Sequence, residues 1–406
     1  MRAPELLCPA GDLTRLKCAV DFGADAVYLA GREFGMRTAS SNFDNDELRE
    51  GIEYAHSHNV AVHITCNITP HNDEIDRIAS FAKTAYDMGA DAFIVGDIGS
   101  ISAIKEIAPD AVIHASVQSG VTNYRTANEL YKLGAKRVVL ARELSIPEIR
   151  EIREKTPADL ELEAFVHGAM CVSYSGRCLL SSYMTGRDAN HGDCAQPCRW
   201  SYSLMEQTRP GQYFDITETD KGTYILNADD LCMAEHISDL AKAGVCSLKI
   251  EGRAKSHYYV AVTTNAYRGA LDAFEKDNDA PCPQWVIEEL NKISHRVYST
   301  GFFYGKPEDA QTYKTAGYIR DYAVAAVVEG YSDGCIVASL KNKFFRGQLL
   351  DCLEAKHQPF MVATDDLRDE NGTPIDVANK PTMIIKIPYE RPVAVGSLLR
   401  MKTSDD

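Results

Sequence analysis

The chain has 406 residues, of which 45% are hydrophobic and 25% are charged, and its formal net charge is −15 at pH 7. This length and composition are typical of a soluble globular protein with one large domain and a second, small one. The acidic total excludes broad, non-specific binding to nucleic acid, which depends on lysine and arginine neutralising phosphates. A local basic surface is compatible with it.

Membrane and secretion signals are not apparent in the sequence. No apolar run approaches the ~18 residues that a membrane span needs. The N-terminus, MRAPELLCPAGDL, contains no apolar stretch of the secretory type and continues directly into a strand-like segment. We therefore expect a cytoplasmic protein that is not bound to a membrane. The twelve cysteines are then expected to be reduced, because disulfides are rare in that compartment.

A repeated phrase organises the first 250 residues. It occurs at 22–30 (FGADAVYLA), 88–97 (MGADAFIVGD), 133–143 (LGAKRVVLARE) and 243–253 (AGVCSLKIEGR). Each copy has a glycine suited to a helix end, followed by a short apolar run that ends in polar residues. The apolar segments LLCPA, VAVHITCN, AVIHASVQ, ELEAFVHG and TYILN bring the total to eight or nine strands, separated mostly by helix-length segments. This alternation predicts an α/β fold with a parallel sheet, and eight units favour a (β/α)8 TIM-like barrel.

A barrel of this kind carries its chemistry on the loops that follow the carboxyl ends of the strands. Many polar residues occupy such positions in the predicted barrel. They are Asn67, Asp97, Ser116, Gln118, Arg142, Glu143, His167, Asn227, Asp229, Glu251 and Arg253.

A cysteine-rich loop follows the EAFVHG strand and opens on the same face. Cys171, Cys178, Cys194 and Cys198 have the spacing C-x6-C-x15-C-x3-C, interrupted by glycine and proline. Four thiolates suit zinc or an iron–sulfur cluster. The C-x2-C knuckles of a zinc ribbon are missing, and the spacing differs from common ferredoxin runs, so we expect an unusual cluster loop. Cys232 is the alternative to Cys198 as fourth ligand; its surroundings, NADDLCMAEHI, predict a helix that begins after an aspartate cap.

The last part of the chain changes pattern to short alternating strands divided by Gly, Asp, Asn and Pro. We predict a barrel domain at 1–305, with the cysteine loop and a β-hairpin inserted at 168–222, and a small β-barrel domain at 312–406. The basic and aromatic segment KNKFFRG is compatible with a nucleic-acid face on this small domain. A structural or dimerising role is equally compatible with the pattern, and a homo-oligomer is left open.

Nine positions around the first two cysteines fit the signature E-x-F-x-x-G-[SA]-φ-C-x4-G-x-C-x-φ-S, in which φ is apolar. They are Glu163, Phe165, Gly168, Ala169, Met170, Cys171, Gly176, Cys178 and Ser181. Through this signature the chain resembles the U32 "peptidase" family, and the similarity extends from ELLCPAGDL through SLKIEGRAKSHYYVAV into the C-terminal extension. The GDCAQPCRW segment and the short C-terminal domain most resemble the branch that hydroxylates uridine in tRNA.

The resemblance implies an oxygen-independent hydroxylation of a tRNA wobble uridine at C5, with prephenate as hydroxyl donor and an iron–sulfur cluster, of the 4Fe–4S type, on the four cysteines. It marks Arg37, Asn42 and Phe43 as functional positions. A second run resembles the family's site-facing residues, with an ion-pair network at the barrel rim as the alternative; it contains Lys249, Glu251, Arg253, Lys255 and Tyr259. Such a reaction needs a pocket for a dicarboxylate, which arginine pairs bidentately. The arginines nominated for it are Arg37, Arg142, Arg187 and Arg253. His167 and Glu251 are the candidates for proton transfer, and the anticodon loop of tRNA is the expected partner.

Other functions remain open at this point. A U32-type peptidase or collagenase would agree with the family name, but neither H-E-x-x-H nor G-x-S-x-G occurs. A Cys171 and His167 nucleophile pair would leave three cysteines of the loop unexplained. An iron–sulfur hydroxylase acting on ribosomal RNA or on a quinone precursor fits the same residues, and so does a non-catalytic RNA-binding module that carries a cluster.

Overall fold

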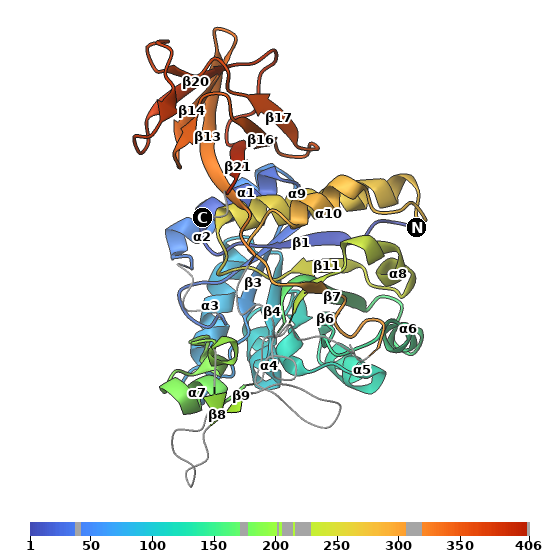
Figure 1. Cartoon of the computed structure of the whole chain (residues 1–406). Helices are drawn as coiled ribbons and strands as arrows, with labels where there is room; N and C mark the ends of the chain where they lie inside the picture. Colours follow the sequence, from blue (N-terminus) through green and yellow to red (C-terminus); the bar gives the residue numbers. More distant parts are fainter. Residues whose placement is uncertain are drawn as a thin grey trace. The chain divides into compact units, whose positions relative to one another are not determined.

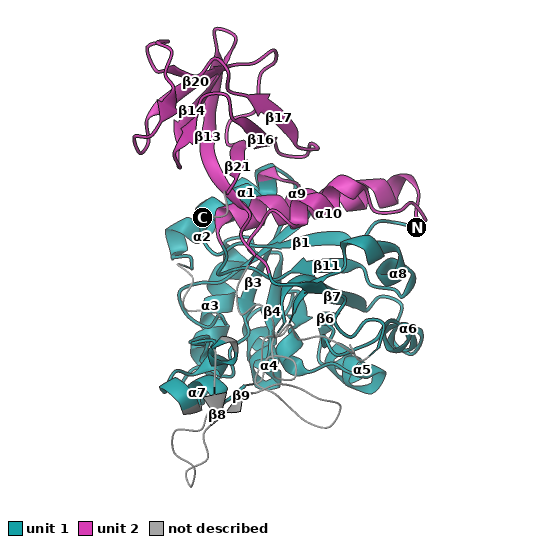
Figure 2. Cartoon of the chain, in the orientation of Figure 1, with its two compact units in different colours: residues 1–20, 24–255, 296–318 teal, residues 21–23, 256–295, 319–406 magenta. Residues whose placement is uncertain are grey.

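The computed structural model describes residues 1–36, 42–170, 178–200, 203–204, 214–215, 229–305 and 319–403. The chain forms two compact units, which are coloured separately in Figure 2. The barrel unit contains residues 1–20, 24–255 and 296–318, and the C-terminal unit contains residues 21–23, 256–295 and 319–406. Within the described residues, no helix is both long and apolar enough to cross a membrane.

Eight parallel strands form a closed barrel, which confirms the predicted (β/α)8 TIM-like fold (Figure 1). Each strand pairs with its neighbours in sequence order, and the last strand pairs with both the first and the seventh, so the ring is complete. The strands are β1 (Glu5–Pro9), β2 (Ala26–Leu29), β3 (Ala61–Cys66), β4 (Ala92–Val95), β5 (Ile113–Ala115), β6 (Ala135–Val139), β7 (Glu161–Ala169) and β11 (Ser247–Ile250).

Helices connect these strands. They are α1 (Leu13–Asp21), α2 (Asn45–Ser57), α3 (Ile75–Asp87), α4 (Ile98–Ile107), α5 (Tyr124–Lys132), α6 (Ile146–Glu154) and α8 (Ile237–Lys242). Local sequence explains where they begin. Asp44 and Glu47 form a capping box at α2, and Ser145 and Glu148 form another at α6, so that side chains satisfy the first backbone N–H groups of each helix.

The insertion after β7 contains α7 (Leu180–Thr185), the short 3-10 turns η3 (Ala189–His191) and η4 (Pro197–Arg199), and the strand pair β8 (Ser203–Leu204) and β9 (Phe214–Asp215). The antiparallel pairing of β8 with β9 agrees with the predicted hairpin. Cys171 and the predicted strand TYILN lie outside the described residues.

The prediction of a helix starting at Cys232 is wrong. Residues Asp230–Cys232 form strand β10, which pairs antiparallel with the end of β7 and parallel with β12 (Tyr298–Ser299). The helix α8 begins only at Ile237, after the short 3-10 turn η5 (Ala234–His236). The reason is the length of β7, whose last residues, Gly168 and Ala169, extend beyond its pairing with β11 and offer backbone groups that β10 satisfies.

The C-terminal unit combines α9 (His257–Lys276) and α10 (Gln284–Leu290) with an antiparallel sheet, which confirms a C-terminal all-β region. Its strands run in the order β17-β16-β21-β13-β14-β20-β18, and a separate pair joins β15 to β19. This order is linear within residues 319–403. The strands are β13 (Tyr322–Ser332), β14 (Cys335–Leu340), β15 (Phe344–Phe345), β16 (Leu349–Leu353), β17 (Phe360–Ala363), β18 (Arg368–Asp369), β19 (Val377–Ala378), β20 (Ile384–Pro388) and β21 (Leu398–Lys402).

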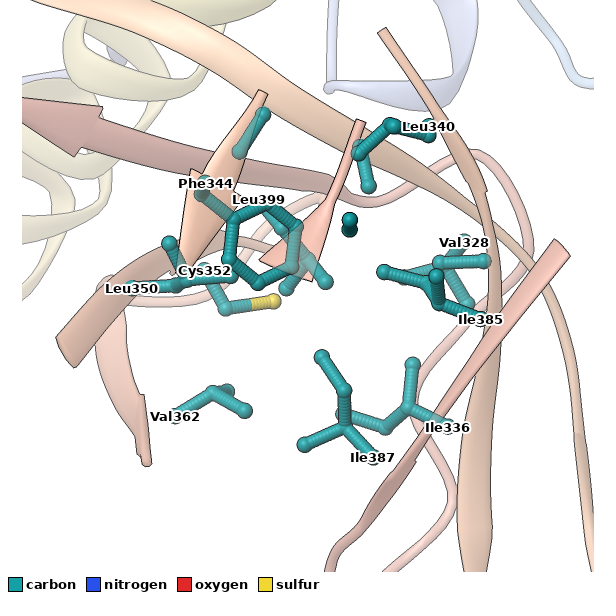
Figure 3. Close-up of a cluster of buried hydrophobic side chains, with 14 of the residues drawn as sticks. Val328, Ile336, Leu340, Phe344, Leu350, Cys352, Val362, Ile385, Ile387 and Leu399 are labelled. Carbon is teal, nitrogen blue, oxygen red and sulfur yellow. The ribbon is translucent and has the colours of Figure 1, made fainter. Parts of the chain in front are cut away.

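A separate hydrophobic core holds this sheet together. Figure 3 shows Val328, Ile336, Leu350, Ile387 and Leu399 pointing toward one another from different strands. All five are fully buried. Because α9 and α10 group with this sheet, the unit contains chain that the sequence-based boundary at 312 assigns to the barrel.

Candidate active site

The inside of the barrel is charged, whereas TIM-barrel interiors are usually filled with branched apolar side chains. Glu163 on β7 is fully buried and accepts hydrogen bonds from Lys249 Nζ at 2.8 Å, Arg137 Nη1 at 3.1 Å and Ser247 Oγ at 3.3 Å. Although burial opposes ionisation, the Lys249 and Arg137 cations lower the pKa of Glu163 to about 2. The Glu163 carboxylate is therefore ionised at pH 7, and its negative charge is balanced by the two cations.

Arg137 links Glu163 to the amino-terminal end of the barrel. Its guanidinium also donates to Glu5 at 2.6 Å and to Glu161 at 2.8 Å. Burial alone would lower the pKa of Arg137, but the surrounding carboxylates raise it, so the residue stays charged. Nearby, His63 and His114 meet edge to face with ring centroids 4.7 Å apart, and burial lowers the pKa of both. These two histidines are neutral at pH 7.

Lys249 connects this interior to the catalytic end of the barrel. Its Nζ lies 4.5 Å from the centroid of the Tyr28 ring and 5.5 Å from that of Phe165. The Cζ atom of Arg142 lies 3.9 Å from the Phe165 ring centroid. Arg142 Nη1 donates to the carbonyl of Ala169 at 3.0 Å, and its Nη2 is 3.7 Å from Glu251 Oε2. Its buried Nε has no hydrogen-bond partner among the described residues.

The two residues predicted for proton transfer lie at this same end. The backbone N–H of Glu251 donates to the carbonyl of His167 at 2.9 Å, so the ends of β11 and β7 hold them side by side. His167 is buried, and its ring centroid is 5.4 Å from that of Tyr298. Cys232 is the residue paired with His167 across the strands β10 and β7. The structure therefore brings His167, Glu251 and Arg142 to one end of the barrel.

Arg253 and Asn42 also meet, in a buried contact. Arg253 Nη1 donates to Thr65 Oγ1 at 2.8 Å and its Nη2 donates to Asn42 Oδ1 at 3.2 Å. Asn42 has a φ of 52°, a left-handed conformation that asparagine tolerates better than most residues. Arg253 thus ties the ends of β11 and β3 to the loop after β2. Lys255 is half-buried in the turn that follows β11, where its backbone N–H donates to the Gly252 carbonyl at 2.8 Å. Arg37 lies outside the described residues.

The described part of the cysteine loop is held by short hydrogen bonds. Cys178 Sγ accepts the backbone N–H of Leu180 at 3.3 Å, and Cys194 Sγ accepts that of Gln196 at 3.4 Å. The buried Ser181 accepts the N–H of Ala195 at 3.0 Å, which joins the two cysteine segments. Cys198 belongs to η4, which packs against α7. In the described residues no three His, Cys, Asp or Glu side chains form a group that could hold a metal ion, and Cys171 is outside them.

The loop is anchored on the catalytic side of the barrel. The backbone N–H of Thr69, which follows β3, donates to the Asn190 carbonyl at 3.1 Å. The rings of His71 and His191 stack with centroids 5.1 Å apart. Farther along, the exposed Arg187 pairs with Asp193 at 2.6 Å. Arg187 therefore lies on the surface of the loop, whereas Arg142 is largely buried.

The sequence reasoning missed the charged interior. The sequence places Glu163 in the family signature and Lys249 in the run that resembles the family's site-facing residues, but it does not pair them with each other or with Arg137. The available signal was a charged residue at alternate positions within strands that are otherwise buried on both faces, as in KRVV and SLKI. Such charges have to compensate one another inside the barrel.

Comparison with known proteins gives matches over both units. The family model for peptidase family U32 matches residues 11–313, and the model for the peptidase family U32 C-terminal domain matches residues 320–400. The chain is 35% identical to tRNA hydroxylation protein P1 of Bacillus subtilis over 98% of this chain and 95% of that one. It is 36% identical to tRNA hydroxylation protein P of Escherichia coli, with 99% and 97% covered. A 23S rRNA 5-hydroxycytidine synthase of Escherichia coli is 33% identical over 81% of this chain and 51% of that protein.

Proposed function

The chain belongs to peptidase family U32, and we propose that it is an enzyme that hydroxylates tRNA. The observation that carries this proposal is the similarity to two tRNA hydroxylation proteins over almost the full length of both partners. Similarity that covers the barrel unit and the C-terminal unit together supports a shared activity better than similarity in one domain. We place the reaction in the cytoplasm, where tRNA is used.

The finer proposal is hydroxylation of the wobble uridine at C5, with prephenate supplying the hydroxyl group. A dicarboxylate needs a cation with free directional donors. Arg142 meets this requirement, because its Nε has no partner among the described residues and its contact with Glu251 is long, at 3.7 Å. Arg253 donates to Thr65 and Asn42, so its first role is to order the mouth of the barrel.

The cysteines fit an iron–sulfur cluster in their chemistry. Backbone N–H groups point at Cys178 Sγ and Cys194 Sγ, and such donors stabilise the thiolate form that ligates iron. Cys171, Cys178, Cys194 and Cys198 would hold the cluster, with Cys232 as the alternative to Cys198. When bound, the cluster would supply electron transfer.

Proton transfer is assigned to His167 and Glu251. A general acid or base has to lie within hydrogen-bond reach of the proton that it moves. The two residues share a backbone hydrogen bond at the end of the barrel, and the Glu251 carboxylate faces Arg142.

The test begins with anaerobic purification and measurement of iron, sulfide and the visible spectrum. The protein is then incubated with prephenate and tRNA from cells that lack the modification, and nucleosides are analysed by mass spectrometry. We expect brown protein and a uridine heavier by one oxygen atom, and we expect Cys178→Ser to lose both. Active wild-type protein without iron would remove the cluster from the proposal. Unchanged uridine in the presence of intact cluster would overturn tRNA hydroxylation.

Hydroxylation of ribosomal RNA is a second candidate, because one relative is named as an rRNA 5-hydroxycytidine synthase. The same assay with 23S rRNA as substrate separates the two. Hydroxylated product on rRNA and none on tRNA would support rRNA as the substrate in place of tRNA.

A further inference from the structure

The ring of Phe165 lies against the guanidinium of Arg142. The distance from Arg142 Cζ to the ring centroid is 3.9 Å, which is well inside the range of a cation–π contact. Phe165 is buried, and the side chain of Arg142 is only 13% exposed. In such a dry environment the contact is stronger than on a surface. The ring therefore restricts where the guanidinium can lie.

Phe165 is itself held from the inside of the barrel. Lys249 stands beside it in the register of β11 and β7, with Nζ 5.5 Å from the ring centroid. Lys249 cannot move freely, because its ammonium is bound to Glu163 at 2.8 Å and lies over Tyr28. Glu163 is in turn fixed by Arg137 and Ser247. The position of the Phe165 ring is thus set by the charged interior.

The guanidinium of Arg142 has one committed donor, one donor with a long contact and one donor without a partner in the described residues. Its Nη1 is committed to the Ala169 carbonyl at 3.0 Å. Its Nη2 has only the long contact with Glu251, and its Nε has no partner in the described part of the chain. A guanidinium edge with Nε and an Nη nitrogen is the fork that binds a carboxylate bidentately. The contacts present leave that fork for a ligand.

We propose that Phe165 is a positioning residue, which acts through Arg142 and fixes the guanidinium fork for one carboxylate of the small-molecule substrate. The inference rests on the proposed function, since it takes Arg142 as the dicarboxylate-binding residue of the same site. It assigns a physical role to the phenylalanine of the E-x-F signature, where a leucine would fill much the same volume without a π face.

The experiment measures prephenate binding by calorimetry and steady-state hydroxylation of tRNA for the holoenzyme and its variants. Phe165→Leu removes the π face, Phe165→Tyr keeps it, and Phe93→Leu is the matched control. Phe93 is a fully buried phenylalanine on β4, so its loss tests the effect of a smaller core residue elsewhere in the barrel. Arg142→Gln, alone and with Phe165→Leu, completes a double-mutant cycle.

We expect Phe165→Leu to weaken prephenate binding by about threefold to tenfold, the size of one cation–π contact, and to leave the KM for tRNA unchanged. Phe165→Tyr should bind like wild type. In the Arg142→Gln background the further loss from Phe165→Leu should fall below about twofold, because the two residues act as one unit. Phe93→Leu should leave prephenate binding unchanged.

Equal losses for Phe165→Leu and Phe93→Leu, or additive effects of Phe165→Leu and Arg142→Gln, would overturn the inference. The measurement of prephenate binding separates failure of the inference about Phe165 from failure of the proposed function. A wild-type protein that binds prephenate and leaves tRNA unchanged would overturn the reaction and still test Phe165. A wild-type protein that does not bind prephenate would overturn both.

Discussion

At the scale of single residues, the interior of the barrel is a set of compensated charges. Burying a charge is costly unless it is paired, and removing one member of a buried pair leaves the other without compensation. Glu163 stands between two cations, Lys249 and Arg137, which lie 2.8 and 3.1 Å from its oxygens. The negative charge of Glu163 therefore compensates both cations inside the barrel.

Replacement of Glu163 by glutamine should destabilise the barrel by about 3 kcal/mol at pH 7, the cost of breaking a buried ion pair. Urea unfolding followed by circular dichroism measures it. Glu129→Gln is the control, because Glu129 pairs with Lys132 on the surface with both side chains about two-thirds exposed. A surface pair of this kind contributes less than ~1 kcal/mol.

The same substitution should change how stability depends on pH. The folded pKa of Glu163 is about 2 and its ordinary value is 4.5, so its ionisation stabilises the fold above pH 4.5, and this stabilisation is lost as the pH falls toward 2. The difference in unfolding free energy between wild type and Glu163→Gln should therefore shrink over that interval. A constant difference from pH 7 to pH 3 would contradict the low pKa of Glu163.

At the scale of elements, the sequence predicts the barrel strands well and the strand β10 badly. The barrel strands are mostly buried on both faces and therefore appear as short runs rich in apolar residues, and β2, β4, β6 and β11 each follow a helix-ending glycine. Strand β10 has only three residues, Asp230–Cys232, and exists because β7 offers a pairing edge. Local sequence contains nothing about that edge, and the aspartates before Cys232 by themselves favour a helix cap.

This strand changes the comparison between Cys198 and Cys232. Cys232 lies opposite His167, near the end of β7 from which the cysteine loop leaves, whereas Cys198 lies in η4 beside α7. A four-thiolate cluster with Cys171, Cys178 and Cys194 needs one more ligand. We expect that one of the variants Cys198→Ser and Cys232→Ser loses iron and colour, while the other keeps them.

Iron analysis of anaerobically purified protein decides this prediction. Cys246→Ser is the matched control, because Cys246 lies just before β11 and outside the cysteine loop. That variant should keep full iron content. Retention of iron by both Cys198→Ser and Cys232→Ser would contradict a four-thiolate site. Loss of iron from both variants would mean that one of the two substitutions disturbs the fold of the site instead of removing a ligand.

At the scale of the whole molecule, the described residues of each unit contain a buried charge network, around Glu163 in the barrel and around Arg400 in the C-terminal unit. In the C-terminal unit, Arg400 is fully buried and pairs with Glu289 on α10 at 2.7 Å and with Asp351 on β16 at 2.8 Å. This network ties a helix to the sheet over more than a hundred residues of sequence. The domain boundary at 312 was placed from strand patterns alone, which contain no information on such a long-range pair.

Arg400→Met should destabilise the C-terminal unit by about 3 kcal/mol, because it leaves the buried carboxylates of Glu289 and Asp351 with Lys292 as their remaining cation. Differential scanning calorimetry should show a lower transition for this unit and an unchanged one for the barrel. Arg368→Met is the control, since Arg368 pairs with Asp366 on the surface and both side chains are well exposed. Equal shifts in the two variants would mean that the Arg400 network adds no stability.

For the proposed tRNA substrate, the net charge of −15 implies binding through a small local footprint. Arg187 lies on the exposed side of the cysteine loop, with its side chain 46% exposed. Lys136 is similarly exposed, at 45%, but lies near the start of β6, at the opposite end of the barrel strands.

Replacement of either Arg187 or Lys136 by glutamine changes the net charge by the same amount. Only the loss of a phosphate contact, however, changes the number of counterions released on binding. Arg187→Gln should therefore lower the slope of log affinity against log salt by about 0.7–0.9, the contribution of one phosphate, whereas Lys136→Gln should leave the slope unchanged. Equal slopes for both variants would place the tRNA footprint away from the cysteine loop.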